Sequence, residues 1–510
     1  MPTYLRRLNS QLFLAGTAVF AFVWAIVRAC VQSVTIDEAS TYISWVARTG
    51  PVQWEAASNN HVLNSLLIRL FTSVFGPSPL TLRIPALFGA AIYIAAAYAF
   101  CRMVTDNGKL QWALFVCLVY NPFVFDYLVA ARGYSLAMAF LLATHAIAAH
   151  AQLPRLGREA RDDVPVCIAC SICAAVSFAA NFAFGIVDAA VMLMILVWFC
   201  GSTRGIAARA RLLAACTLPG LLVTLFLAGP VLLNWPKPEL HFGAASLRET
   251  LDSVVRSSLY QLNPDLVNPL ILGWMGRPKH FLLPLLAATA VVPLIRAARR
   301  RTVDQDPHSA WLRALGAVLL GATALALLVH WLAFRLFHVL LPMDRTAVFF
   351  VPLLTLLFGI AAAFPAPARA WDLCRRALLV TMFAVSLYFL GCLRLGYFRE
   401  WQWDADLKKV YPVLAYYNRT YCVRDFVANW MYGAPLNFYR LTSGQDTISE
   451  IRGPLAVPAD GLIYVLDRYF DGDFIQQQKL RVVYRGDTTR VVVAIRSEVE
   501  TRPCRVATVP

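Results

Sequence analysis

The chain has 510 residues, of which 59% are hydrophobic and only 15% are charged. Water-soluble domains carry about 25% charged residues, so this composition excludes an ordinary soluble enzyme. Apolar runs of about 20 residues, long enough to cross roughly 30 Å of hydrocarbon, recur along most of the chain. They predict a polytopic α-helical membrane protein.

The first apolar run, residues 13–31, is long and lacks a small-residue cleavage site, so we interpret it as a retained span rather than a signal peptide. In all, we expect about eleven transmembrane helices, which places the two termini on opposite sides of the membrane. The expected spans are 12–31, 83–103, 111–129, 134–151, 164–181, 183–200, 212–233, 281–296, 314–336, 347–364 and 377–393.

The net charge of +16 would suggest nucleic-acid binding in a soluble protein. Here, arginines gather at the N-terminus and in the short loops on one side of the expected topology. They are Arg6, Arg7, Arg204, Arg209, Arg211, Arg299, Arg300, Arg301, Arg369, Arg375 and Arg376. By the positive-inside rule that side is cytoplasmic. We therefore expect a multi-pass cell (inner) membrane protein with a cytoplasmic N-terminus, contacts to membrane lipids and no nucleic-acid partner.

Two long loops, residues 32–82 and 234–280, then fall on the external side. The first contains DEASTYISWVARTG and NNHVLNSLLIRLFTSVFG, and the second contains LRETLDSVVRSSLYQL. All three segments have apolar residues at helical spacing, and we interpret the first two as amphipathic helices lying in the interface.

After Arg394 the sequence becomes polar. DADLKKVYPVLAYYNR predicts an amphipathic helix, GLIYVLDRY a strand, and LRVVYRGDTTRVVVAIR a hairpin that turns at Gly486 and Asp487. We expect a transmembrane module at 1–395 and a small extracytoplasmic α/β domain at 396–510. Cys422 and Cys504 would pair if that domain faces an oxidising compartment. Its aromatic residues form either its core or an acceptor-binding surface.

Asp37 and Glu38 follow the first span directly. Acidic residues near a helix start complement the helix dipole, with Thr35 or Asp37 as the cap. Alternatively, one of them is a general base at the membrane surface, which takes a proton from an acceptor hydroxyl while a lipid-linked donor stays in the bilayer. Both roles are compatible, because a capped helix holds a base rigidly.

A second polar cluster, NNHVLN, comes immediately before an apolar helical stripe. Its residues Asn60, His61 and Asn64 include a pair three apart that shares one helix face. A single histidine in such a place is either a hydrogen-bonded structural residue or a contact to phosphate or sugar.

Two further stretches place charges at external span ends, where they are costly unless paired or functional. The first stretch, NPFVFDYLVAARGYSL, contains Asp126 and Arg132, and Tyr134 begins the next span. Either Asp126 and Arg132 form a salt bridge with each other, or Arg132 binds a phosphate. In FHVLLPMDRTAVFFVP, Arg345 lies on the external side against the positive-inside trend, which favours contact with an anion.

These four segments, in this order and topology, resemble the GT-C superfamily of membrane glycosyltransferases. They are most similar to the family 39 group, which is related to protein O-mannosyltransferases and lipid A aminoarabinose transferases. The resemblance rests on DEASTY, on NNHVLNSLLIRLF followed by SPLTLRIPALFGA, on NPFVFDYLVAARGYSL and on LPMDRTAVFFVP, and it covers roughly residues 1–395.

The resemblance implies an inverting hexosyl- or pentosyltransferase of the cell envelope that uses a polyprenyl-phosphate-sugar donor. Asp37 matches the family's catalytic carboxylate, with Glu38 as its supporting partner. The candidate substrate contacts are Asn60, His61, Asn64, Asp126, Arg132, Tyr134 and Arg345, the two arginines holding the leaving phosphate. A glycan, a lipid or a protein remains open as acceptor, and so does a divalent cation as cofactor.

The main alternative is a polytopic transporter or a flippase for lipid-linked sugars. Transporters place functional polar groups near the membrane midplane, whereas the notable polar residues of this chain lie at external span ends and in external loops. A noncatalytic assembly subunit is a third interpretation, but it would not require the acidic pair.

Overall fold

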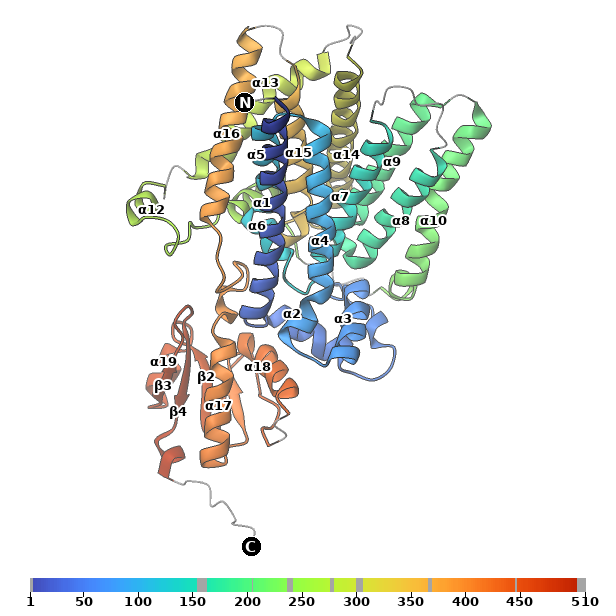
Figure 1. The fold of residues 1–510 in the computed structure, drawn as a ribbon. Coiled ribbons are helices and arrows are strands. Elements are labelled where there is room, and N and C mark those ends of the chain that lie inside the picture. The colour runs from blue at the N-terminus through green and yellow to red at the C-terminus, as the bar shows by residue number, and fades with distance from the viewer. Residues whose placement is uncertain are drawn as a thin grey trace. The chain divides into compact units, whose positions relative to one another are not determined.

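The computed structural model describes residues 3–153, 163–203, 205–235, 242–275, 279–299, 306–365, 369–444 and 447–501. The chain divides into two compact units (Figure 1). Unit 1 comprises residues 1–26, 54–64 and 85–393, and unit 2 comprises 27–53, 65–84 and 394–510. Segments of the first expected external loop therefore belong to the same unit as the C-terminal residues.

Long apolar helices make up most of the chain. Helices α1, α3 and α4 contribute residues to both units, and α5 to α16 belong to unit 1. Their bounds are α1 Thr3–Val31, α3 Val62–Phe75, α4 Pro79–Val104, α5 Gly108–Val119, α6 Pro122–Tyr127, α7 Tyr134–Ala151, α8 Val164–Ala180, α9 Gly185–Ser202, α10 Ile206–Leu233, α11 Leu247–Ser258, α12 Pro269–Met275, α13 Lys279–Arg299, α14 Pro307–Phe337, α15 Phe350–Ala363 and α16 Arg369–Gly391.

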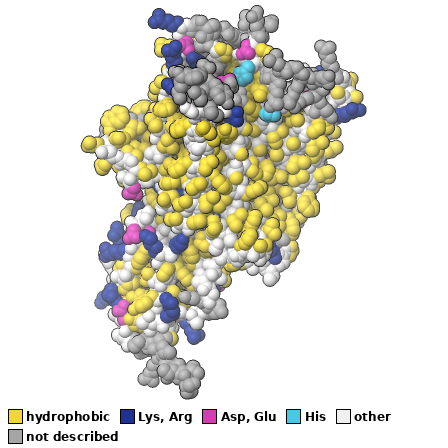
Figure 2. Space-filling model, viewed as in Figure 1, with side chains coloured by type: hydrophobic (Ala, Val, Ile, Leu, Met, Phe, Trp, Pro, Cys, Tyr) yellow, Lys and Arg dark blue, Asp and Glu magenta, His cyan; other side chains and the backbone are white. Residues whose placement is uncertain are grey.

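Eight helical segments in the described part of the chain are long and apolar enough to cross a membrane. They coincide with eight of the expected spans, and shorter apolar helices occur at the other three, in α5, α8 and α13. Figure 2 shows hydrophobic side chains covering the visible face of these helices. Phe226 and Leu336, 81% and 65% exposed, are examples. Such a surface is stable against lipid, so the polytopic membrane fold is confirmed.

One expected span is interrupted. The sequence predicts a continuous helix over 111–129, but α5 ends at Val119 and a short helix, α6, begins at Pro122. The Asn121 side chain accepts a hydrogen bond from the Phe123 amide and caps α6, with Pro122 at its first position. An asparagine–proline pair favours a helix start over a helix interior, and it produces the turn that leads to Arg132.

Within unit 1, α7 packs against α8, α8 against α10, and α9 against α14. Because α7 begins just after Gly133 and α8 ends at Ala180, the start of one lies beside the end of the other. A Cβ atom added to Gly133 would lie 2.2 Å from the Ala180 carbonyl oxygen. The positive φ of +74° at Gly133 also favours glycine.

Unit 2 contains a four-stranded sheet of order β1-β2-β4-β3, with β1 Phe426–Ala428, β2 Ile463–Asp467, β3 Arg481–Arg485 and β4 Val491–Ile495. Strand β1 is parallel to β2, and the other pairs are antiparallel. The expected strand and the β3–β4 hairpin with its turn at Gly486 and Asp487 are confirmed. Strand β1, only three residues long, has too short a sequence pattern to be predicted.

Four helices complete unit 2: α2 Ile36–Thr41, α17 Leu407–Tyr421, α18 Trp430–Thr442 and α19 Gly472–Gln477. Helix α17 coincides with the expected amphipathic helix. The aromatic residues divide between core and surface: Trp401, Tyr417 and Tyr432 are buried, whereas Trp403, Tyr416 and Trp430 are exposed. Cys422 is disulfide-bonded, and Cys504, its expected partner, lies outside the described residues.

Candidate functional site

Helix α2 begins with a capping box. The Thr35 hydroxyl accepts a hydrogen bond from the Glu38 amide at 3.2 Å, and the Thr35 amide donates to Glu38 Oε2 at 2.9 Å. This reciprocal pair satisfies two backbone amides at the helix start. The sequence-based interpretation of these residues as a helix cap is therefore correct, with Thr35 as the N-cap.

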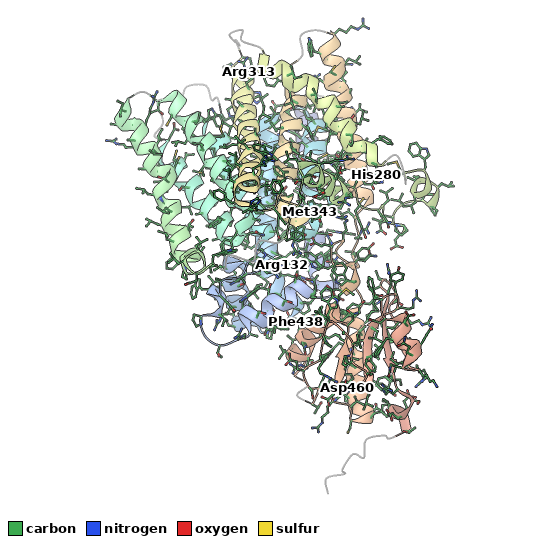
Figure 3. All side chains as sticks on the ribbon, turned by 180° about the vertical axis from the view of Figure 1, so that it is seen from behind. Arg132, His280, Arg313, Met343, Phe438 and Asp460 are labelled. Atoms are coloured by element: carbon green, nitrogen blue, oxygen red, sulfur yellow. The ribbon has the colours of Figure 1, made fainter. Side chains whose placement is uncertain are left out.

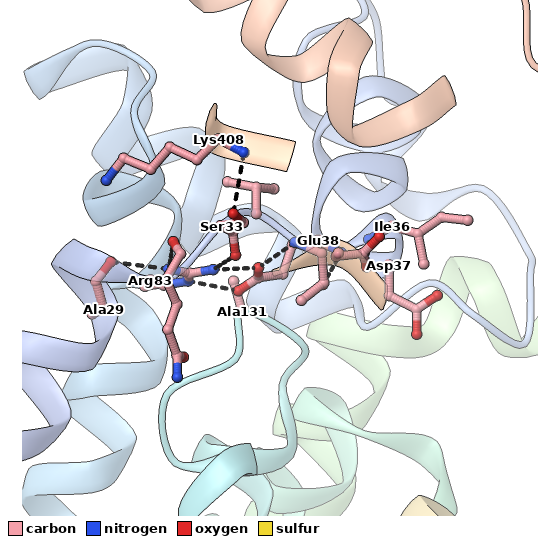
Figure 4. Close-up of polar contacts among 12 residues, drawn as sticks. Ala29, Ser33, Ile36, Asp37, Glu38, Arg83, Ala131 and Lys408 are labelled. Atoms are coloured by element: carbon pink, nitrogen blue, oxygen red, sulfur yellow. Dashed lines mark hydrogen bonds and ion pairs between the residues drawn. The ribbon is translucent and has the colours of Figure 1, made fainter. Parts of the chain in front are cut away.

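Glu38 also forms a buried ion pair with Arg83 of α4, and both side chains are fully buried (Figure 4). Arg83 Nε donates to Glu38 Oε1 at 2.9 Å, and Nη2 donates to Oε2 at 2.7 Å. This two-point geometry fits guanidinium to carboxylate.

The remaining Arg83 donors contact the C-terminal end of α1. They bond the carbonyl oxygens of Ala29 and Gln32, at 3.0 and 2.9 Å, and of Ser33 at 2.7 Å. Helix ends leave carbonyls without partners, and Arg83 satisfies that of Ala29 in the last turn of α1 together with those of the two residues after Val31. Arg83 therefore fixes α2 relative to the end of α1.

The start of α2 is held from the other side by C-terminal residues. The Ile36 amide donates to Asp404 Oδ2 at 2.8 Å, and the Val34 amide donates to the Tyr439 hydroxyl at 2.9 Å. Sequence reasoning missed both partners, because their relation to residues 33–36 is purely tertiary.

Asp404 is buried, and its Oδ1 atom has no hydrogen-bond partner among the described residues. Burial raises its pKa well above the usual range, and the charges of Asp37 and Glu38 add to that shift. Asp404 therefore holds a proton more strongly than an ordinary aspartate.

Asp37 differs from both acidic neighbours. Its side chain is half-buried, and Figure 4 shows its carboxylate pointing away from the Arg83–Glu38 pair. Its backbone carbonyl accepts from the Thr41 hydroxyl at 2.9 Å, within α2. Asp37 is thus a carboxylate on a rigid, doubly anchored helix start.

A second polar cluster lies in unit 1. Figure 3 places Arg132 and Met343 toward one end of its helices and Arg313 toward the other. Arg132 is fully buried, and its Nη2 donates to Asn59 Oδ1. Asn64 Nδ2 donates to the Ala131 carbonyl at 3.1 Å, so the start of α3 is tied to the turn that carries Arg132.

His61 lies in the same cluster and is buried, with its ring 5.4 Å from that of Tyr134. Burial lowers its pKa well below the usual range, and the positive charges of Arg132 and Arg345 lower it further. His61 is therefore a neutral imidazole at neutral pH. The potential that disfavours its protonation would favour a bound anion.

Arg345 belongs to a 3-10 turn, Asp344–Ala347, between α14 and α15. The Asp344 amide donates to the Ser253 hydroxyl of α11 at 2.9 Å, and the Ser257 hydroxyl donates to Asp344 Oδ1 at 3.3 Å. The half-buried guanidinium lies 4.9 Å from the ring centroid of Phe242. Helix α11 thus positions the turn that carries Arg345.

The remaining predicted contacts occupy different surroundings. Asn60 is buried, and its Nδ2 donates to the Glu55 carbonyl at 2.9 Å. Asp126 is buried in α6, where its backbone carbonyl accepts from the amides of Val129 and Ala130. Tyr134 is buried between the rings of His61 and Tyr127. The structure therefore brings His61, Asn64, Arg132 and Tyr134 together around one turn.

A divalent cation would need a set of oxygen or nitrogen ligands. Within the described ranges, no group of three or more His, Cys, Asp or Glu residues could hold a metal ion. The Glu38 carboxylate is already bonded by Arg83 and the Thr35 amide, so it does not fit the role of a metal ligand.

No protein-family model matches the chain, and no curated protein sequence matches it significantly. Its fold matches the crystal structures of ArnT from Cupriavidus metallidurans, bound to undecaprenyl phosphate and in the apo state. The TM-score is 0.51 for both, at 13% and 14% identity, covering 96% of this chain and 98% of ArnT. The Archaeoglobus fulgidus oligosaccharyltransferase tethered with an acceptor peptide matches with a TM-score of 0.44 at 11% identity, over 99% of this chain and 75% of that one.

At this level of identity, the ArnT match establishes a shared fold. The chain therefore has the same overall fold as ArnT: in this chain, a polytopic helical membrane fold with a small C-terminal sheet.

Proposed function

We propose that the chain is an integral-membrane glycosyltransferase that moves a sugar from a polyprenyl-phosphate donor to an acceptor hydroxyl, with inversion at the anomeric carbon. The observation that carries the proposal is the electropositive cluster of unit 1, where Arg132 and Arg345 both act on the buried, neutral His61. The solved ArnT structure that shares this fold is bound to undecaprenyl phosphate, which is a ligand of the matching charge and lipid character.

In this proposal Asp37 is the general base. It accepts the proton of the acceptor hydroxyl as that oxygen attacks the anomeric carbon. The bond between the anomeric carbon and the phosphate oxygen breaks, and its electron pair leaves with the polyprenyl phosphate. A general base of this kind contributes about 10²- to 10⁴-fold to the rate.

Arg132 and Arg345 would stabilise the phosphate as negative charge develops on it, since guanidinium groups bind phosphate oxygens with directed hydrogen bonds. His61, Asn60, Asp126 and Tyr134 are the remaining proposed substrate contacts or supports of them. Glu38, fully buried against Arg83, would position Asp37 rather than touch substrate.

We further propose that the reaction takes place on the extracytoplasmic face of the inner membrane, with the N-terminus in the cytoplasm. The positive-inside pattern supports this orientation, and so does disulfide-bonded Cys422 in unit 2, because disulfides persist in oxidising compartments. The acceptor is a glycan, a lipid or a protein of the cell envelope.

Binding of undecaprenyl phosphate to the purified protein tests the anion site. Charge-assisted hydrogen bonds contribute about 1.5–3 kcal/mol, so Arg132→Ala and Arg345→Ala should each weaken binding by about 10- to 100-fold. Arg335→Ala is the matched control, because Arg335 is exposed in the last turn of α14 and stacks on Trp331 as Arg345 stacks on Phe242. Equal binding by all three variants would contradict the assignment.

Turnover separates an enzyme from a transporter. Labelled undecaprenyl-phosphate sugars are offered to the protein together with envelope extract as a source of acceptors. A glycosyltransferase releases undecaprenyl phosphate and labels an acceptor, whereas a flippase binds the donor and moves it intact across a vesicle membrane.

A further inference from the structure

Three chain segments meet at the turn 131–133. Asn64, at the start of α3, donates to the Ala131 carbonyl. A Cβ atom at Gly133 would lie 2.2 Å from the Ala180 carbonyl oxygen at the end of α8, and 3.1 Å from His61 Cβ. Residues 61–64 and 180–181 are therefore packed against the same short turn.

The two segments packed against the turn, 61–64 and 180–181, present three buried side-chain atoms that have no hydrogen-bond partner in the described part of the chain. The atoms are His61 Nδ1, Asn64 Oδ1 and Asn181 Nδ2, and their side chains are 4%, 0% and 2% exposed. Buried polar atoms are satisfied in the great majority of cases, and leaving one unsatisfied costs about 1–3 kcal/mol. Three such atoms around one turn indicate a polar ligand.

The orientation of both amides is fixed by backbone partners. Asn64 uses its nitrogen to donate to a carbonyl, so its unpartnered atom is the oxygen, an acceptor. Asn181 uses its oxygen to accept from the Ala183 amide at 3.0 Å, so its unpartnered atom is the nitrogen, a donor. Exchanging oxygen and nitrogen in either side chain would place like atoms against each other.

This pair of atoms distinguishes between ligand groups. An ionised phosphate only accepts hydrogen bonds, so it cannot satisfy the Asn64 oxygen. A hydroxyl group both donates and accepts, so it satisfies the Asn64 oxygen and the Asn181 nitrogen equally well. Arg132, between these residues in the same turn, is suited to the phosphate.

We propose that Asn64 and Asn181 bind the transferred sugar, Asn181 donating to one hydroxyl group of it and Asn64 accepting from one. The assignment rests on the proposed glycosyltransferase function and deepens it: the donor carries a hydroxyl-bearing sugar whose free hydroxyl groups are read beside the phosphate. Asn181 has no role in the motifs that define the family resemblance.

Asn181→Ser removes the amide nitrogen that would donate to the sugar and keeps a side-chain oxygen that can cap the following turn. The serine hydroxyl still accepts from the Ala183 amide, since serine is a good capping residue, but the amide nitrogen is gone. Asn121→Ser is the matched control, because Asn121 is also buried and caps a helix through its side-chain oxygen, and its nitrogen is not among the unpartnered atoms.

The test compares the affinity of each purified protein for undecaprenyl-phosphate sugars with its affinity for undecaprenyl phosphate itself. Loss of one hydrogen bond corresponds to about a tenfold change. Asn181→Ser should weaken binding of the sugar-bearing lipid by about that factor and leave binding of undecaprenyl phosphate unchanged, and Asn121→Ser should change neither. Equal effects on both lipids, or none on the sugar-bearing one, would overturn the assignment of Asn181.

A measurement on the unaltered protein does not depend on whether variants fold. An undecaprenyl-phosphate sugar with all hydroxyls acetylated cannot donate to Asn64, so it should bind more weakly than the free sugar form. If it binds equally well, the sugar assignment is wrong while the anion site stands. If the unaltered protein binds neither undecaprenyl phosphate nor its sugar forms, the proposed function fails as well.

Discussion

Truncating Arg83 to alanine removes the guanidinium that pairs with Glu38 and that bonds the carbonyls of Ala29, Gln32 and Ser33 at and just beyond the end of α1 (Figure 4). Both charged side chains are fully buried, so the Glu38 carboxylate would lose the guanidinium that pairs with it in the interior. Breaking a buried ion pair in this way costs about 3–5 kcal/mol. We expect the melting temperature of the purified protein in detergent to fall by on the order of 10 °C.

Arg102→Ala is the matched control, since Arg102 lies in the last turn of the same helix and is exposed. Surface substitutions of this kind change stability by about 0.5 kcal/mol or less. Adding Glu38→Gln to Arg83→Ala should recover part of the loss, because the neutral amide keeps the cap oxygen without a buried charge. If Arg83→Ala melts together with Arg102→Ala, or if the double variant melts below the single one, the buried ion pair does not stabilise the fold in this way.

Two further variants test local features of the site. Gly133→Ala should lower both the melting temperature and the affinity for undecaprenyl phosphate, because the new Cβ atom would clash with the Ala180 carbonyl oxygen. Gly76→Ala is the control: Gly76 has a φ of +76° but lies in open space, so this variant should lose only about 1–2 kcal/mol of stability through left-handed backbone strain. Equal losses of stability in the two variants would contradict a clash at Gly133. Asp404 has a raised pKa in the folded protein, so the folded chain keeps a proton that the unfolded chain releases above about pH 4. The stability of the fold therefore falls as the pH rises from about 4 through the pKa of Asp404 in the folded state. Asp404→Asn should therefore make the melting temperature less dependent on pH in that window, and an unchanged pH profile would count against a buried, protonated Asp404.

The membrane architecture was largely predictable, because a span needs only a long apolar run and the chain has many. The predicted continuous helix over 111–129 was wrong because of a single polar pair. Asn121 and Pro122 end one apolar helix and begin another within a run whose hydropathy alone indicates one helix. The β3–β4 hairpin was predictable from its turn residues, whereas β1 depends on pairing with β2, which is distant in sequence.

Within the candidate site, the sequence located the clusters but not the partners. His61, Asn64 and Arg132 attract notice as polar residues at the edges of apolar segments, and they do meet. Arg83 is likewise a charged residue in the first turns of an apolar helix, so the same criterion could have identified it as a site residue. Asp404 and Asn181 could not be found in this way. An aspartate in a polar stretch and an asparagine between two spans show nothing unusual until tertiary contacts reveal their partners.

The proposed mechanism requires Asp37 to take the proton of the acceptor hydroxyl. The most direct measurement is single-turnover transfer from a labelled undecaprenyl-phosphate sugar by the unaltered protein and by Asp37→Asn, with donor binding measured on the same preparations. We expect a rate at least about 100-fold lower in the variant, with donor affinity and melting temperature nearly unchanged. Equal rates in the two proteins would contradict it.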